Sequence, residues 1–192
     1  MGVTTGADKQ RSYNGDYMAA GKYAEAICLE FVKRSPSVLA IEDTRNLRVL
    51  READVDCVMH LYDGRCHLAE FKSDAHLGVT GNVLFEVLRV NHTAPPEKSC
   101  VLGWSARSPA KFLLYFAPEK RCIYLCTFDG LRGAFQRYTR DQRKRTRLDW
   151  VNTDSIKSTV NVLIPWGYCE EVFTVHDVSD ICEALSTDGR RA

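Results

Sequence analysis

Apolar positions recur at helical spacing near the start of the chain. This spacing predicts one amphipathic helix over residues 16–33, because residues that recur once per helical turn share a face. Asp16 is its expected N-cap, and Ser35-Pro36 ends it, since proline disfavours helical geometry in the preceding residue. The apolar residues that carry the pattern are Tyr17, Ala20, Ala24, Ile27, Cys28 and Phe31.

After this helix the pattern changes to short runs that are typical of β-strands. Residues 54–62 alternate in polarity, residues 66–71 are mostly apolar, and Asp63-Gly64 between them favours a tight turn, so the two runs predict a β-hairpin. The apolar runs 111–117 and 122–128 flank a proline-containing turn and predict a second hairpin. Further strands are expected at 38–41 (extended or repeated at 47–50), 100–104, 159–164 and 172–175, and further helices at 83–90 and 131–147.

This order of elements predicts an α/β fold with a central mixed β-sheet flanked by helices, in a single domain. The domain is expected over residues 15–182, because 192 residues suffice for one hydrophobic core. Residues 1–14 are polar and contain glycine, and we expect a flexible N-terminal arm there. Residues 183–192 are also polar, and we expect a flexible C-terminal tail.

Composition narrows the class of protein. With 45% hydrophobic and 27% charged residues the chain is typical of a globular protein, and its net charge of +1 means that nucleic-acid affinity would need a local patch. No apolar run approaches the roughly 20 residues that span a bilayer, and residues 1–15 lack the apolar core of a signal peptide. None of the eight cysteines forms a C-x-x-C pair, which favours free thiols. We therefore expect a soluble protein of a host-cell cytoplasm, without a membrane partner.

The first predicted hairpin carries two aspartates on one strand and Glu70 and Lys72 on the next. Side chains alternate between the faces of a strand, so Glu70 and Lys72 share a face, as do Asp54 and Asp56. An antiparallel turn then brings Asp54 or Asp56 to Glu70 and Lys72. Two carboxylates suit a hard cation, Mg²⁺ above all, and a lysine beside them can orient a water or stabilise charge on a phosphoryl group. A solvated hairpin face with cross-strand ion pairs is the other interpretation, but charges are costly to bury in so apolar a strand.

The chain resembles the PD-(D/E)XK nuclease superfamily in the order of three features. These are a predicted helix that carries Glu25, then Asp56 followed by apolar residues, and then Glu70-x-Lys72. In that superfamily the aspartate opens one strand and the E-x-K motif occupies the next. Asp56 fits this form better than Asp54 does, and the proline that can precede the aspartate has no counterpart here.

The resemblance extends downstream to small phage-type nucleases of this superfamily and covers residues 16–138. The chain departs from them at Ala110-Lys111, where relatives often carry Ala-Asp. The matching segments are Glu70-Phe71-Lys72-Ser73-Asp74, Thr80-Gly81-Asn82-x-x-x-Glu86, Gly103-Trp104-x-x-Arg107-Ser108, Tyr115-Phe116 and Leu131-Arg132.

The resemblance implies a restriction-endonuclease-like core and a magnesium site. Asp56 and Glu70 would bind Mg²⁺, which Mn²⁺ can replace, and the carbonyl oxygen of Phe71 would be a further ligand. Lys72 would activate or orient the attacking water. The resemblance thus assigns four positions of the hairpin to metal binding or catalysis.

The resemblance also implies roles for residues outside the hairpin. Glu25 would hold a metal-bound water or orient Lys72, and Thr80 and Asn82 would contact the scissile phosphate. Ordinary roles remain open for two of these positions, Glu25 on the solvated face of its helix and Asn82 as a helix N-cap. For Glu86 of the matching segment, the ordinary role is a surface residue or a partly buried ion-pair partner.

Basic side chains crowd the predicted helix 131–147, with Phe135 and Tyr138 among them. Such a patch suits phosphate contacts with release of counterions, and aromatic rings stack on unpaired bases. A solvated helix face without a partner is the other interpretation. The residues expected to bind nucleic acid here are Arg132, Arg137, Arg140, Arg143, Lys144, Arg145 and Arg147.

Together with these patterns, the resemblance implies a Mg²⁺-dependent DNA nuclease that hydrolyses phosphodiester bonds, of phage or mobile-element type. The alternative is a nuclease fold that binds nucleic acid or another partner without turnover, and RNA is a less favoured substrate than DNA. The sequence leaves open whether the protein acts as a homodimer. It contains neither a G-x-S-x-G nucleophile elbow nor a phosphate-binding P-loop, which argues against a serine hydrolase and an NTPase.

Overall fold

A computed structural model gives the structure of the chain and describes residues 6–74, 77–95, 99–141, 148–153 and 157–188. The α-helices are α1 (Gly6–Lys33), α2 (Arg48–Glu52), α3 (Leu77–Thr80), α4 (Trp104–Arg107), α5 (Phe128–Asp141) and α6 (Ser179–Asp188). Two 3-10 turns follow strands, η2 (Pro118–Lys120) and η3 (Trp166–Tyr168). The strands are β1 (Val38–Asp43), β2 (Cys57–Leu61), β3 (Cys66–Ser73), β4 (Asn82–Asn91), β5 (Cys100–Leu102), β6 (Phe112–Ala117), β7 (Cys122–Thr127), β8 (Leu148–Thr153), β9 (Lys157–Pro165) and β10 (Thr174–Asp177).

The larger of two sheets is mixed and has six strands in the order β1-β2-β3-β6-β7-β10. Its first three strands form an antiparallel meander, β3 and β6 run parallel, and β6, β7 and β10 are antiparallel again. The expected mixed sheet flanked by helices is therefore present. A parallel pair needs a long crossover, and the chain between β3 and β6 supplies one that includes α3, β4, β5 and α4.

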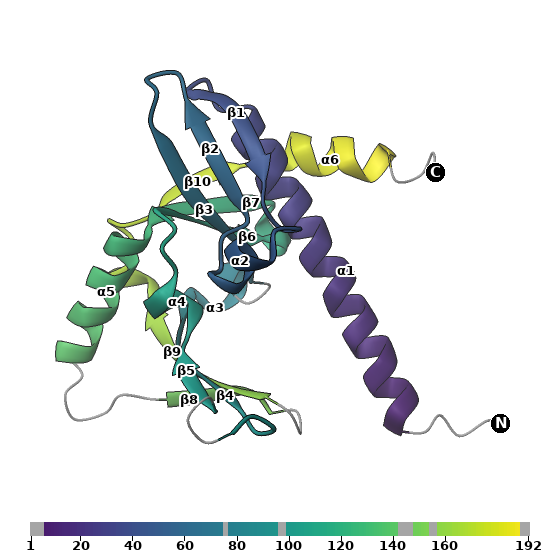
Figure 1. The fold of residues 1–192 in the computed structure, drawn as a ribbon, viewed down its shortest axis with the longest axis vertical. Helices are drawn as coiled ribbons and strands as arrows, with labels where there is room; N and C mark the ends of the chain where they lie inside the picture. The colour runs from purple at the N-terminus through teal and green to yellow at the C-terminus, as the bar shows by residue number, and fades with distance from the viewer. Residues whose placement is uncertain (1–5, 75–76, 96–98, 142–147, 154–156, 189–192) are drawn as a thin grey trace.

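The smaller sheet has four strands in the order β5-β4-β9-β8, all antiparallel. Its centre is the long pairing of β4 with β9, from Asn82 opposite Pro165 to Asn91 opposite Lys157. Figure 1 shows this sheet at the end of the molecule away from the β2–β3 turn, with α1 and α5 on opposite sides. The smaller sheet thus forms a second layer that the sequence patterns did not predict as a separate sheet.

The two faces of the larger sheet bury different cores, because neighbouring residues of a strand point to opposite sides. Leu114 of β6 packs in a cluster with α1 and α6, whereas Leu113 packs in a cluster with α5 and the smaller sheet. On β3, Phe71 belongs to the α1 side. Glu70 and Lys72 therefore leave the sheet on its other face, toward α4 and the smaller sheet.

Both predicted hairpins are confirmed. The β2–β3 turn passes through Asp63-Gly64, where Gly64 has a φ of +83° that favours glycine. Two predictions of element type are wrong. The segment 83–90 is not a helix but the centre of β4, where cross-strand pairing to β9 decides its conformation. The segment 47–50 is not a strand, since α2 begins at Arg48.

Within the described residues, helices extend further toward both termini than the sequence predicted. The helix α1 begins at Gly6, so Asp16 lies inside the helix and is not its N-cap. Helical structure covers residues 6–14, where a flexible arm was expected, and α6 continues to Asp188 into the expected tail. The helix α5 ends at Asp141, and residues 142–147 of the predicted basic helix lie outside the described residues.

Candidate active site

The β2–β3 hairpin brings Asp56 to the E-x-K segment of β3. Cys57 pairs with Ala69, so Asp56 lies just before the first paired residue of β2. One carboxylate oxygen of Asp56 accepts a hydrogen bond from the backbone N–H of Phe71 at 2.7 Å. The N–H and C=O of one strand residue point to the same side of the strand. The carbonyl of Phe71 therefore faces the side of Asp56, beyond the end of the β2 ladder.

Glu70 is a buried carboxylate with one oxygen unpartnered. Its side chain is 3% exposed, and Oε1 pairs with the ammonium group of Lys72. Oε2 is buried and has no hydrogen-bond partner. Burial raises the pKa of Glu70 to about 8, against the opposing positive charge of Lys72 and with the added negative charge of Asp56. A buried carboxylate oxygen without a partner is costly, and a cation beside it would remove that cost.

Lys72 lies between a carboxylate and an aromatic ring. Its side chain is 28% exposed, and its ammonium nitrogen lies 5.1 Å from the centre of the Trp104 ring, within the range of a cation–π contact. Burial alone would lower the pKa of Lys72, but the negative charges of Glu70 and Asp56 leave that pKa raised. The lysine is thus held in its charged form next to the carboxylates.

Asp54, the second aspartate of the motif, has a different partner. Its carboxylate forms an ion pair with Arg107 of α4 at 2.6 Å, and its side chain is 11% exposed. The hydroxyl of Ser108 donates to its backbone carbonyl at 2.9 Å. Asp54 has a φ of 55°, a left-handed conformation that is uncommon for residues other than glycine. The structure thus ties Asp54 to α4 and leaves Asp56 as the aspartate in contact with the E-x-K backbone.

The helix α4 contacts Lys72 of β3 through Trp104 and Asp54, which precedes β2, through Arg107. Glu86 of β4 fixes the position of this helix. A carboxylate oxygen of Glu86 accepts hydrogen bonds from the backbone N–H of Trp104 at 3.2 Å and from Arg89 at 3.0 Å. The backbone N–H of Glu86 donates to the hydroxyl of Ser105. Glu86 is therefore a buried ion-pair partner, one of the roles the sequence left open. The positions of Trp104 and Arg107 at the site were not predicted, although both belong to the downstream series that carries the resemblance.

Glu25 is not in contact with Lys72. Its carboxylate pairs with Arg45 at 2.9 Å, and Arg45 also pairs with Asp43. The helix α1 packs against the face of the sheet that carries Phe71, whereas Lys72 leaves the opposite face. The structure therefore groups Glu25 with Arg45, which follows β1, and with Asp43, which ends that strand.

Thr80 and Asn82 flank Gly81, whose φ is +66°, at the junction of α3 and β4. Thr80 is exposed and ends α3, and Asn82 is half-buried and begins β4, so Asn82 is not a helix N-cap. The backbone N–H of Asn82 donates to the hydroxyl of Thr80 at 3.3 Å. This junction turns the chain from the larger sheet into the smaller one.

The described basic residues of α5 differ in their contacts. Arg132 donates to the backbone carbonyls of Ser105 and Ser108 and lies over the Phe128 ring, so its guanidinium joins α5 to α4. Arg137 and Arg140 are exposed. The other four residues predicted to bind nucleic acid, which lie outside the described residues, are Arg143, Lys144, Arg145 and Arg147.

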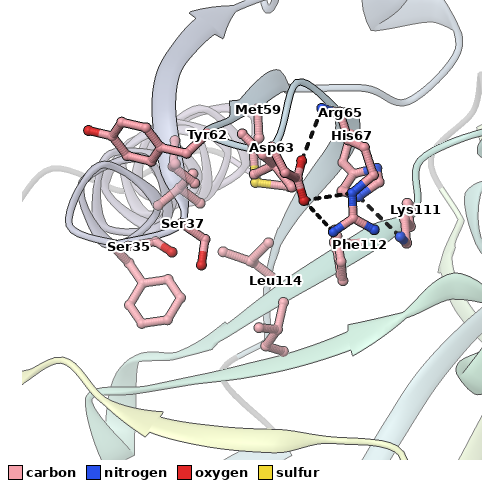
Figure 2. A pocket seen from close by; sticks show the side chains of 15 residues that line it. Ser35, Ser37, Met59, Tyr62, Asp63, Arg65, His67, Lys111, Phe112 and Leu114 are labelled. Carbon is pink, nitrogen blue, oxygen red and sulfur yellow. Dashed lines mark hydrogen bonds and ion pairs between the residues drawn. The ribbon is translucent and has the colours of Figure 1, made fainter.

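A pocket of about 530 Å³ opens on the α1 side of the larger sheet, near the β2–β3 turn. Figure 2 shows two polar pairs beside it, Asp63 with Arg65 and His67 with Lys111, and the apolar Leu114 in its lining. Its volume is within the range of small-molecule sites. The pocket is separate from the carboxylates and lysine of the candidate active site, which leave the opposite face of the sheet.

Among the described residues, no group of three or more His, Cys, Asp and Glu side chains is arranged to hold a metal ion. The candidate site offers two carboxylates, of Asp56 and Glu70, and the carbonyl of Phe71. Within the part of the chain that the structure describes, no helix is both long and apolar enough to cross a membrane. Comparisons with models of known families, with curated proteins and with solved structures gave no match.

Proposed function

We propose that the protein is a Mg²⁺-dependent DNA nuclease with a restriction-endonuclease-like core. The observation that carries the proposal is the convergence of Asp56, Glu70 and Lys72 across the β2–β3 hairpin, with a buried oxygen of Glu70 left without a partner. This is the local arrangement that the resemblance to PD-(D/E)XK nucleases implies, with the aspartate at the start of one strand and E-x-K on the next.

The residues at this site fit a divalent cation with oxygen ligands. A cation would give Glu70 Oε2 the partner that it lacks. The Asp56 carboxylate lies at the next residue, where it accepts a hydrogen bond from the backbone N–H of Phe71, and the Phe71 carbonyl faces the same side of the strand. When bound, Mg²⁺ would supply Lewis-acid chemistry that polarises a phosphate oxygen and acidifies a water. Lys72, one position beyond Phe71 and already charged, would orient that water or offset the negative charge that develops on the phosphate.

A cleavage assay with two single variants, their double variant and one control variant tests this proposal. Plasmid, linear duplex, single-stranded DNA and RNA are incubated with protein in EDTA, in Mg²⁺ and in Mn²⁺. Wild-type protein should cleave DNA only with a metal ion, and Glu70→Gln and Lys72→Met should each lose about 100-fold or more of the rate. Glu52→Gln is the matched control, since that carboxylate is 61% exposed on α2. Unchanged cleavage by the Glu70→Gln/Lys72→Met double variant would contradict the assignment.

A second candidate is a nucleic-acid-binding protein that keeps this arrangement without turnover. It is favoured by the contact of Lys72 with Glu70, which already gives that carboxyl group a cationic partner. It is also favoured by the small number of acidic side chains, because the described residues offer two carboxylates here and no group of three or more metal ligands. The same assay separates the two candidates. Retarded migration of DNA without cleavage, in all metal conditions, would favour the binding protein.

A further inference from the structure

A cysteine, a histidine and a glutamate lie side by side on the first three strands. Cys66 begins β3 directly opposite His60 of β2, and its sulfur lies 3.1 Å from Nδ1 of His60. The other ring nitrogen of His60 lies 3.8 Å from a carboxylate oxygen of Glu42 on β1. A thiol, an imidazole and a carboxylate therefore follow one another across the strands, in the order nucleophile, base and partner of the base.

This thiol differs from the other cysteines of the chain. Cys66 and Cys100 are exposed, Cys122 is half-buried, and the remaining five are buried. Buried thiols are inert toward reagents in solution. No hydrogen bond of the Cys100 side chain is found among the described residues, whereas Cys66 has an imidazole within reach. Cys100 is therefore a natural reference for an exposed thiol without a base.

We propose that Cys66 is a site of thiol–disulfide exchange with low-molecular-weight disulfides such as glutathione disulfide. This inference does not rest on the proposed nuclease activity, because none of its three residues belongs to the candidate active site. His60 acts as the base, and Glu42 stabilises the imidazolium that forms when His60 takes the proton.

The exchange needs no oxidant other than the disulfide itself. His60 Nδ1 takes the proton from the sulfur of Cys66 as that sulfur attacks one sulfur of the disulfide. The bond between the two sulfurs of the reagent breaks, and a mixed disulfide forms on Cys66. The departing thiolate takes the proton back from the imidazolium and leaves as a free thiol. One protein thiol and one disulfide thus give one mixed disulfide and one small thiol.

The experiment measures the rate of modification at each cysteine of the full-length reduced protein. Glutathione disulfide is added, samples are quenched with acid, and trypsin then releases Cys66 in peptide 66–72 and Cys100 in peptide 99–107 for mass spectrometry. Cys66 should gain glutathione at least about 10-fold faster than Cys100. His60→Gln should slow Cys66 to about the rate of Cys100. Glu42→Gln should slow it about two- to five-fold, as expected for an exposed ion pair.

Two other cysteines, measured in the same samples, serve as controls. Cys100 should react at its wild-type rate in both variants, and Cys57, which is 0% exposed, should remain unmodified as long as the sheet is folded. If His60→Gln exposes Cys57, then Glu42→Gln at the more exposed end of the array carries the test alone. Equal rates at Cys66 and Cys100 in the wild-type protein would overturn the proposal. So would an unchanged Cys66 rate in a variant that keeps Cys57 protected.

Discussion

At Glu70, burial and charge act against each other. Its carboxylate is almost fully buried, its pKa is raised to about 8, and one oxygen has no partner. A proton and a cation are alternative ways to relieve that burial, since metal binding requires the deprotonated carboxylate. The state of Glu70 without metal is therefore measurable without any substrate.

The raised pKa of Glu70 predicts how stability depends on pH in EDTA. Between its ordinary pKa of 4.5 and about 8, the folded protein holds a proton on Glu70 that the unfolded chain has released. The contribution of this group is fully present below 4.5 and is lost as the pH rises through about 8. Urea unfolding across this range should therefore show a free energy of unfolding that falls with pH, and Glu70→Gln should flatten that fall. Parallel curves for wild type and variant would contradict the prediction.

The pair of Asp54 and Arg107 predicts a compensating double variant. Arg107→Met should lower the free energy of unfolding by about 1–3 kcal/mol, because it leaves the mostly buried Asp54 carboxylate without its cation. Asp54→Asn removes the charge, and asparagine tolerates the left-handed backbone of this position. The double variant should therefore be more stable than the sum of the two single effects predicts, as measured by urea unfolding. Strictly additive effects would show that the pair is not coupled.

At the scale of elements, α4 and β4 are joined closely at Gly103. A Cβ atom added at Gly103 would lie 2.2 Å from the carbonyl oxygen of Glu86, so only glycine fits there. Because α4 follows directly and carries Trp104 and Arg107, any shift at Gly103 moves the residues that contact Lys72 and Asp54. The position of α4 thus links β4 of the smaller sheet to the candidate active site.

Gly103→Ala should therefore lower both stability and metal-dependent cleavage. The added Cβ would clash with the backbone of β4, which cannot move aside as a flexible side chain can. We therefore expect a loss of about 2–4 kcal/mol in the free energy of unfolding. Gly167→Ala is the matched control, since a Cβ there meets nothing within 4 Å. Thermal unfolding of both variants, followed by the cleavage assay, checks the prediction. Wild-type stability of Gly103→Ala would show that α4 can shift without cost.

The elements that the sequence predicted correctly are those set by local signals. The β2–β3 hairpin follows from alternation and Asp63-Gly64, and so does the meeting of Asp56 with the E-x-K segment. The run 83–90 is short and apolar, and periodicity alone does not distinguish a strand from a helix in such a run. Its pairing with β9, some seventy residues away in sequence, decides the matter. Arg107 reaches Asp54 across a separation of 53 residues, so no local pattern indicated that contact.

The face on which a helix packs is also beyond local sequence patterns. Glu25 lies on a correctly predicted helix, yet α1 covers the face of the sheet opposite to Lys72. Which face α1 covers depends on how its apolar residues meet the sheet as a whole. The residue type and position of Glu25 in the sequence therefore fit the resemblance. In the structure, however, its carboxylate pairs with Arg45 and not with Lys72.

At the scale of the whole molecule, a net charge of +1 leaves little general attraction for nucleic acid. Under the proposed function we expect the attraction for DNA to come from a local patch, and the arginines of α5 are the candidates that the structure describes. Their contacts divide them into two groups. Arg132 is used inside the fold, where it donates to two carbonyls of the α4 segment. Arg137 and Arg140 are exposed, and Arg137 also donates one hydrogen bond to the carbonyl of Tyr168.

These two groups should respond differently when charge is removed. The double variant Arg137→Gln/Arg140→Gln should keep wild-type stability, while the slope of log affinity against log salt for duplex DNA, measured in EDTA, becomes shallower by about 1–2. Arg132→Gln should leave that slope unchanged but lower the free energy of unfolding by about 1–3 kcal/mol, because two buried carbonyls lose a charged donor. Fluorescence anisotropy and urea unfolding measure the two quantities. An unchanged slope in the double variant would place the DNA-binding surface elsewhere on the molecule, since two lost phosphate contacts must release fewer counterions.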